Sequence, residues 1–177
     1  MRIETELKYD FDDVLIRPKR STLTSRKEVD LHRSYKFKHG GTYFGIPIMA
    51  ANMDGVGTVE VSKELSDIGL FTCLKKSLDK KTLIAELTTE REYNVAVTIG
   101  KSDLDFNKLI FLKEALLTEG YTLKFLCVDV ANGYSQSFVD FIKKVRAFLP
   151  HTNIIAGNVV TGEMVEELLL AGADIVK

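Results

Sequence analysis

Two residues of this chain, Asp129 and Lys76, have types and surroundings that suit acid–base chemistry or the binding of a polar ligand. Asp129 lies in the apolar run Leu126-Cys-Val-Asp-Val-Ala131, so its carboxylate would lose much of its water on folding. A buried carboxylate needs a cation or several hydrogen-bond donors, and Lys76, which follows another apolar run, is the natural partner. A lysine–carboxylate pair in a cleft can position a cofactor amide or relay a proton. The alternative interpretation is a purely structural ion pair.

Residues that favour turns or carry polar groups end other apolar runs in the same way. They are Asn52, Met53 and Asp54 after the first run, Gly100 after the third, Asn132 and Gly133 beyond the fourth, and Asn158 in the fifth. Turns favour Asn, Asp and Gly for backbone reasons alone, so each single occurrence has a structural explanation. The agreement of all the runs favours one shared functional surface at their carboxyl ends.

The elements that carry these residues alternate in a regular order from residue 46 onward. Strands are predicted at 46–51, 70–74, 94–99, 123–130 and 153–159, helices at 58–68, 79–87, 103–119, 135–148 and from 161, and a sixth strand opens at 174–177. Apolar runs that do not alternate with polar residues are typical of strands covered on both faces, as in a parallel sheet with crossover helices. This order fits a doubly wound sheet or an eight-fold barrel.

A barrel is preferred, because the glycine-rich turn of dinucleotide-binding sheets is absent: Asn52-Met-Asp-Gly-Val-Gly57 has the wrong spacing. The predicted fold class is therefore α/β, a (β/α)8 TIM barrel that is incomplete here, with about five βα units and the start of a sixth strand. Residues 1–45 are predicted to form an extended polar arm, and residues 46–177 the first part of the barrel. Active sites of such barrels lie at the carboxyl ends of the strands, where the polar residues fall.

Composition argues against several other functions. The net charge of −1 gives no general attraction to nucleic acid or to an anionic membrane, and no apolar run approaches the roughly 20 residues of a membrane-spanning helix. Cys73 and Cys127 lie inside apolar runs, which predicts buried reduced thiols and a cytoplasmic protein. No spacing typical of metal ligands occurs, so no metal site is predicted.

Four long motifs follow one another along the chain. They are Asp10-Phe-Asp-Asp-Val-Leu-Ile-Arg-Pro-Lys-Arg-Ser21, Ala51-Asn-Met-Asp-Gly-Val-Gly-Thr58, Val128-Asp-Val-Ala-Asn-Gly-Tyr-Ser135 and Ala156-Gly-Asn-Val-Val-Thr-Gly-Glu-Met-Val-Glu-Glu-Leu168. Together they closely resemble the GMP reductases of the IMP dehydrogenase/GMP reductase family, over essentially the whole chain. IMP dehydrogenase shares the barrel and a similar Phe-Asp-Asp-Val start, but it usually carries a regulatory insertion for which residues 94–128 leave no room.

The resemblance implies an NADPH-dependent oxidoreductase that converts GMP to IMP with release of ammonia, in purine nucleotide salvage, and that forms a homotetramer. It implies a covalent intermediate on a cysteine that attacks the purine. The cofactor-binding residues that it implies are Ser25, Arg26, Lys76, Asp129, Val130, Ala131 and Asn158. Ser25 and Arg26 would touch NADPH of a neighbouring subunit, Met53 and Asn158 are the expected substrate contacts, and Lys76 and Asp129 are the expected catalytic residues.

The chain also departs from the family pattern. Relatives commonly have His-Lys-His-Tyr where this chain has Lys75-Lys-Ser-Leu78. In relatives, Ile-Val-Lys leads into a loop with the nucleophilic cysteine, an acid–base threonine and a monovalent-cation (K+) site. We therefore expect this chain to be the amino-terminal part of the enzyme and to be inactive alone. Two alternatives stay open: a non-catalytic truncated barrel module that associates with a full-length relative, and IMP dehydrogenase.

Overall fold

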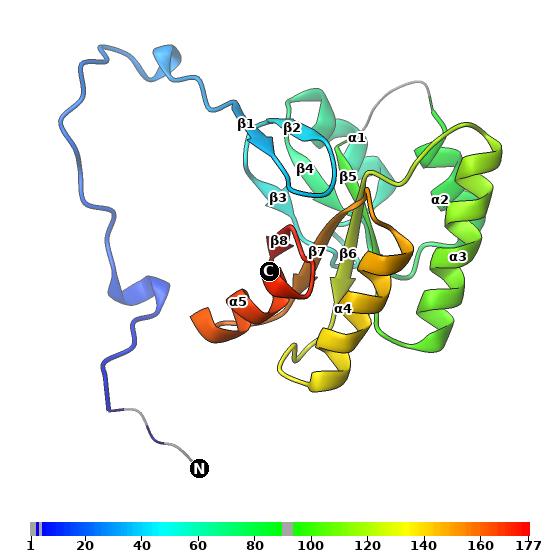
Figure 1. The fold of residues 1–177 in the computed structure, drawn as a ribbon. Coiled ribbons are helices and arrows are strands. Elements are labelled where there is room, and N and C mark those ends of the chain that lie inside the picture. Colours follow the sequence, from blue (N-terminus) through cyan, green and yellow to red (C-terminus); the bar gives the residue numbers. More distant parts are fainter. Residues whose placement is uncertain (1–2, 4, 90–93) are drawn as a thin grey trace. The chain divides into compact units, whose positions relative to one another are not determined.

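The computed structural model of the chain describes residue 3 and residues 5–89 and 94–177. The chain divides into two compact units, one up to Asp30 and one from Leu31 onward, and each is described by itself. Figure 1 labels the helices and strands. Within the described residues, no helix combines the length and the apolar character that crossing a membrane requires.

The first unit is extended chain with two short 3-10 turns, Phe11–Asp13 (η1) and Arg26–Glu28 (η2). Asp10 begins η1 by accepting a hydrogen bond from the backbone N–H of Phe11 at 2.7 Å. The apolar side chains of Leu15 and Ile16 are each 98% exposed. A segment that buries so little apolar surface gains little from packing within itself, which agrees with its lack of a regular apolar period.

The larger unit is built on a six-stranded parallel sheet whose strands are neighbours in sequence order. The strands are β3 (Met49–Ala50), β4 (Phe71–Cys73), β5 (Val95–Ile99), β6 (Phe125–Asp129), β7 (Asn153–Gly157) and β8 (Ile175–Val176). The connecting helices are α1 (Val59–Asp67), α2 (Lys80–Leu87), α3 (Asp103–Thr118), α4 (Gln136–Phe148) and α5 (Gly162–Leu170). The sheet curls, with the helices along its outer face (Figure 1), and the predicted barrel wall of five βα units and a sixth strand is confirmed.

Side-chain caps fix where several helices begin. Thr58 and Asp79 each accept a hydrogen bond from a backbone N–H in the first turn of the following helix, at 3.2 and 2.9 Å. Ser102 caps α3 in a reciprocal capping box. Thr161 holds the N-cap position of α5 without a side-chain cap bond; its hydroxyl instead accepts a hydrogen bond from the Tyr134 hydroxyl at 3.2 Å.

The two faces of the sheet carry separate apolar clusters. On β5, Val95, Val97 and Ile99 belong to the large cluster that the helices cover, whereas Ala96 belongs to a smaller cluster inside the curl. The smaller cluster consists of Tyr43, Phe71, Cys73, Ala96, Phe125, Cys127 and Ile155. Burial on both faces explains why the strands read as continuous apolar runs.

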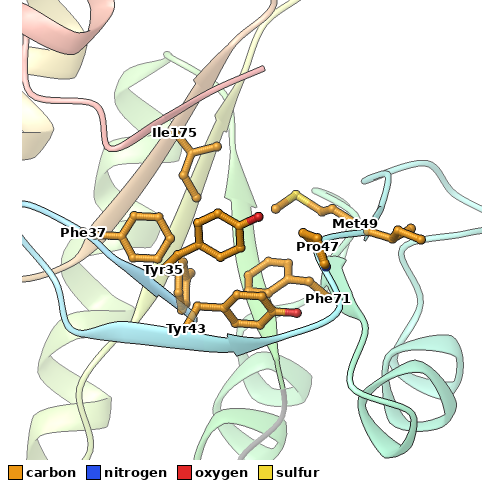
Figure 2. A pocket seen from close by; sticks show the side chains of 9 residues that line it. Tyr35, Phe37, Tyr43, Pro47, Met49, Phe71 and Ile175 are labelled. Carbon is orange, nitrogen blue, oxygen red and sulfur yellow. The ribbon is translucent and has the colours of Figure 1, made fainter. Parts of the chain in front are cut away.

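An antiparallel hairpin of β1 (Arg33–Lys36) and β2 (Thr42–Gly45) lies against the amino ends of the parallel strands. Its aromatic side chains meet Phe71 and Phe125, which are the first residues of β4 and β6, in edge-to-face contacts. Figure 2 shows Phe37, Tyr43 and Phe71 around an apolar pocket that Phe125 also lines. The hairpin belongs to the larger unit, although its residues fall in the segment predicted as an arm; the domain division at residue 45 stays a prediction.

Candidate active site

An open hollow lies at the carboxyl ends of the parallel strands. It is lined by Asn52, Met53, Asp54, Lys76, Ser77 and Asp129. Parallel strands in sequence order bring their carboxyl ends to one rim, so residues that are far apart in sequence meet there. The two residues singled out first, Lys76 and Asp129, therefore share one hollow.

The expected direct pair between Lys76 and Asp129 is not formed. The ammonium of Lys177 contacts the Asp129 carboxylate instead, and it also donates to the Asn52 side-chain oxygen at 2.8 Å. Lys177 and Asp129 are 30% and 26% exposed. We call Asn52, Asp129 and Lys177 the rim cluster; it offers an acceptor, a cation and an amide that a ligand can reach.

The register of the sheet explains why Lys177 reaches Asp129. The two residues come from β6 and from the end of β8, with β7 between them, and Asp129 is level with Gly157 on β7. Alternate strands contribute side chains to the same layer of a barrel interior. Because the β7 residue at this level is glycine, no side chain separates the carboxylate from the ammonium, and a Cβ on Gly157 would collide with the backbone of Lys177.

Lys76 is held by α3 rather than by Asp129. Its ammonium lies 3.3 Å from the carboxylate of Asp105, and Gly100 lets the two approach, because a Cβ there would overlap them. Lys108 donates to the backbone carbonyls of Lys76 and Leu78 at 3.0 and 2.8 Å, which fixes the loop after β4. The Lys76 side chain as a whole stays 54% exposed.

Burial and hydrogen bonds shift the pKa values of these supporting groups. Burial opposes ionisation of Asp105, but hydrogen bonds from Ser102 and backbone N–H groups, together with the Lys76 charge, hold its pKa below the usual range. Burial lowers the pKa of Lys108. Asp105 is therefore a carboxylate at neutral pH, and it keeps a fixed negative charge beside Lys76.

The loops that follow β6 and β7 are joined by backbone hydrogen bonds. Val130 donates to the carbonyl of Gly157 at 2.8 Å, Asn158 donates to the carbonyl of Val130 at 2.9 Å, and Gly133 donates to the carbonyl of Asn158 at 2.9 Å. Ala131 lies in the same bonded loop and is exposed. The predicted residues Val130, Ala131 and Asn158 thus lie in two hydrogen-bonded loops at the rim.

The remaining predicted residues differ in their placement. Met53 lines the hollow and is 64% exposed. Ser25 accepts a hydrogen bond from the backbone N–H of Lys27 at 3.2 Å, and Arg26 begins η2 in the first unit, where both are exposed. Their expected contacts with a neighbouring subunit stay a prediction.

Sequence reasoning missed Lys177 and Asp105. Lys177 follows Ile175-Val176, so the rule that selected Lys76 at the end of an apolar run also selects it. Asp105 carries a weaker signal, as the third residue after Ser102 in a capping pattern. No group of three or more His, Cys, Asp or Glu side chains that could hold a metal occurs in the part of the chain that the structure describes.

Comparisons with known proteins agree with this architecture. The sequence model of the IMP dehydrogenase / GMP reductase domain matches residues 8–177. A GMP reductase of Caenorhabditis elegans is 52% identical over 180 residues, covering 99% of this chain and 49% of the relative. GMP reductase 1 of Homo sapiens is 52% identical over 179 residues, covering 99% of this chain and 51% of the relative.

A solved structure shows the same likeness in three dimensions. The inosine 5′-monophosphate dehydrogenase from Legionella pneumophila matches with a TM-score of 0.76 and 26% identity, over 94% of this chain and 49% of that one. The chain spans about half the length of the curated relatives it matches. On the family match and the shared barrel architecture, the chain belongs to the IMP dehydrogenase/GMP reductase family.

Proposed function

We propose that this chain is part of a GMP reductase, an NADPH-dependent oxidoreductase that converts GMP to IMP and ammonia in purine nucleotide salvage. Relatives named GMP reductase, which are 51–52% identical over essentially its whole length, support the proposal. The observation that carries it is the rim cluster, in which the Lys177 ammonium joins Asp129 and Asn52, two residues that line one open hollow. IMP dehydrogenase has less support, because the solved structure of that name is 26% identical.

The rim cluster suits the carboxamide of a nicotinamide, which presents a donor and an acceptor. Asp129 can accept from the amide N–H2, and Lys177 can donate to its oxygen while it keeps Asp129 oriented. NADPH, when bound, supplies the hydride for the reduction. Lys76, about half exposed and paired with Asp105, adds a positive charge that attracts the anionic cofactor.

The other predicted residues receive supporting roles in this proposal. Asn158 and Met53 would border the purine, and the backbone hydrogen bonds of Val130 would hold the loop that carries Ala131 beside the nicotinamide. Ser25 and Arg26 would contact NADPH of a neighbouring subunit in a homotetramer, where the guanidinium fork of Arg26 suits a phosphate. The nucleophilic cysteine and the K+ site of the family are assigned to no residue of this chain.

Binding and turnover of the 177-residue chain test the proposal. We expect saturable binding of NADPH, followed by nicotinamide fluorescence, and no GMP-dependent loss of the absorbance of reduced nicotinamide by the chain alone. Lys101→Ala is the matched control, because that ammonium binds Ser135 and Ser137 outside the hollow. NADPH binding should survive this change and weaken in Asp129→Asn.

Other outcomes would replace the proposal. Oxidation of IMP with NAD+ as the acceptor would favour IMP dehydrogenase. A chain that binds neither NADPH nor GMP, but that co-purifies with a full-length GMP reductase, would favour the non-catalytic module.

A further inference from the structure

Tyr134 joins two loops at the carboxyl ends of the strands, the loop after β6 to which it belongs and the loop after β7. Its hydroxyl accepts a hydrogen bond from the backbone N–H of Val160 at 2.9 Å. The same hydroxyl donates to the Thr161 hydroxyl at 3.2 Å. The backbone N–H of Tyr134 donates to the Asn132 side-chain oxygen at 3.0 Å, which holds the tyrosine within its own loop. One phenol hydroxyl therefore connects two segments that are far apart in sequence.

Three successive backbone N–H groups of the loop after β7 donate to three different neighbours. The first two, from residues 158–159, donate to the backbone carbonyls of Val130 and Lys177, at 2.9 and 3.1 Å. The third, from Val160, donates to the Tyr134 hydroxyl. Two of the three acceptors are backbone groups, so the Tyr134 hydroxyl is the one that a substitution can remove.

Side-chain packing does little to hold the end of this loop. The Val160 side chain is 91% exposed, and Tyr134 is 43% exposed. Segments with few buried apolar contacts open locally at a low free energy. The two hydrogen bonds of the Tyr134 hydroxyl therefore supply much of what holds the loop in one conformation.

The start of α5 shows that this bridge takes the place of a local helix cap. Thr58 caps α1 by accepting a hydrogen bond from a backbone N–H in the first turn, at 3.2 Å. Thr161 has the extended backbone of an N-cap residue, but its hydroxyl accepts from Tyr134 instead of from the helix. Loss of the Tyr134 hydroxyl would free Thr161 to cap α5, so the stability lost with the bridge would be partly regained.

We propose that Tyr134 is a positioning residue, whose hydroxyl holds the loop after β7 so that Asn158 meets the nicotinamide and the purine. The inference rests on the proposed function, in which Asn158 contacts both. Asn158 lies two residues before Val160, and its carbonyl accepts from the N–H of Gly133, the neighbour of Tyr134, at 2.9 Å. A change at the bridge therefore reaches Asn158 through the backbone. A loop that occupies its binding conformation for only a fraction of the time lowers the apparent affinity by that fraction.

A double-mutant cycle on the full chain tests the inference, with NADPH binding followed by nicotinamide fluorescence. Tyr134→Phe removes the hydroxyl and keeps the ring. A net hydrogen bond changes an equilibrium by about two- to tenfold, so we expect the NADPH affinity to fall by about three- to tenfold. Asn158→Ala should weaken binding without abolishing it, because Asp129 and Lys177 remain. In that background Tyr134→Phe should change the affinity by less than about twofold, since Tyr134 acts through Asn158.

A purely structural role of Tyr134 would give the same loss of affinity in both backgrounds. Urea unfolding measures stability separately, and Tyr134→Phe should change it little, because Thr161 can cap α5 instead. Tyr121→Phe is the matched control: it removes the same group from a residue that precedes β6, at the amino end of the sheet, and should leave the NADPH affinity unchanged.

The possible outcomes separate this inference from the proposed function. Unchanged affinity in Tyr134→Phe or in Asn158→Ala would overturn the positioning role and leave the proposed function in place. Equal losses from Tyr134→Phe in the two backgrounds, or the same loss in Tyr121→Phe, would do so as well. Absence of NADPH binding by the unmodified chain would overturn the proposed function itself, and the inference with it.

Discussion

The two ends of the sheet use similar charged residues in opposite ways. At the amino end, the carboxylate of Asp174 is fully buried and contacts the Arg146 guanidinium at 2.6 Å, His39 Nδ1 at 2.9 Å and the Ile154 backbone N–H at 3.0 Å. At the carboxyl end, Asp129 and Lys177 remain about a quarter to a third exposed. The amino end is saturated with internal bonds, whereas the carboxyl end leaves bonding capacity for a ligand.

Arg146 shows how complete the bonding at the amino end is. Besides Asp174, its guanidinium donates to the carbonyls of Gly172, Leu149, Pro150 and Thr152. Each partner comes from the loop after α4 or from the turn before β8, so the guanidinium joins both segments below the sheet. The comparison teaches that burial and saturation, rather than residue type, distinguish a structural ion pair from a functional one.

The largest effect is expected at the amino end. Asp174→Ala leaves the Arg146 guanidinium mostly buried and without its anion, and should lower the free energy of unfolding by about 3–5 kcal/mol. Urea unfolding at fixed protein concentration measures this. Asp129→Ala is the matched change at the carboxyl end, and its partly exposed pair should contribute less than about 1 kcal/mol. Equal losses in the two variants would erase the distinction between the two ends.

A smaller loss of stability is expected where Gly157 on β7 approaches Lys177 at the end of β8. Gly157→Ala places a methyl group against the backbone of Lys177, and overpacking of this kind costs about 1–3 kcal/mol. It should also weaken NADPH binding, because it moves Lys177 away from Asp129. Gly162→Ala is the control, since a Cβ there meets no atom within 4 Å. Stability and NADPH binding should both be unchanged in Gly162→Ala. Unchanged stability and NADPH binding in Gly157→Ala would show that the close approach is not required.

Asp129→Asn sharpens the comparison by separating stability from binding. The partly exposed pair of Asp129 and Lys177 contributes less than about 1 kcal/mol to stability, so the urea midpoint should barely move. Hydrogen bonds to charged groups contribute about 1.5–3 kcal/mol, so loss of the charge should weaken NADPH binding by about tenfold or more. Nicotinamide fluorescence measures the affinity. A large loss of stability with unchanged affinity would place Asp129 among the structural residues.

The fold was predictable because its signals are local. Apolar runs such as 94–99 and 123–130 and the glycines that end helices fix the order of elements without knowledge of long-range contacts. The hairpin before the barrel was missed, although Tyr35 and Phe37 alternate with polar residues, because two short strands carry little signal alone. Its aromatic side chains become informative only once Phe71 and Phe125 are placed beneath them.

The pairing of charges was less predictable than their position. The strand-end rule placed Lys76 and Asp129 at one rim, but the choice of partner depends on which side chains share a layer and where small residues leave space. Gly157 opens the path from Asp129 to Lys177, and Gly100 opens the path from Lys76 to Asp105. Both are tertiary features, and a single sequence does not report them.

The smallest effect is expected at Asp105, and it depends on pH. Hydrogen bonds and Lys76 lower the folded-state pKa of Asp105, so its charge stabilises the fold above the unfolded pKa of about 3.9, and this contribution is lost as the pH falls through the lower folded value. Asp105→Asn keeps the shape of the side chain and removes the charge. It should lower the free energy of unfolding by less than about 1 kcal/mol at neutral pH, because the partner Lys76 is largely exposed. The difference between the two proteins should shrink toward zero as the pH is lowered below about 4. Urea unfolding of both proteins across this range measures it. A difference in free energy of unfolding that grows on acidification would contradict this, because it would mean that the fold favours the neutral carboxyl group of Asp105. Lys76 would then lack the fixed anion that holds it at the rim.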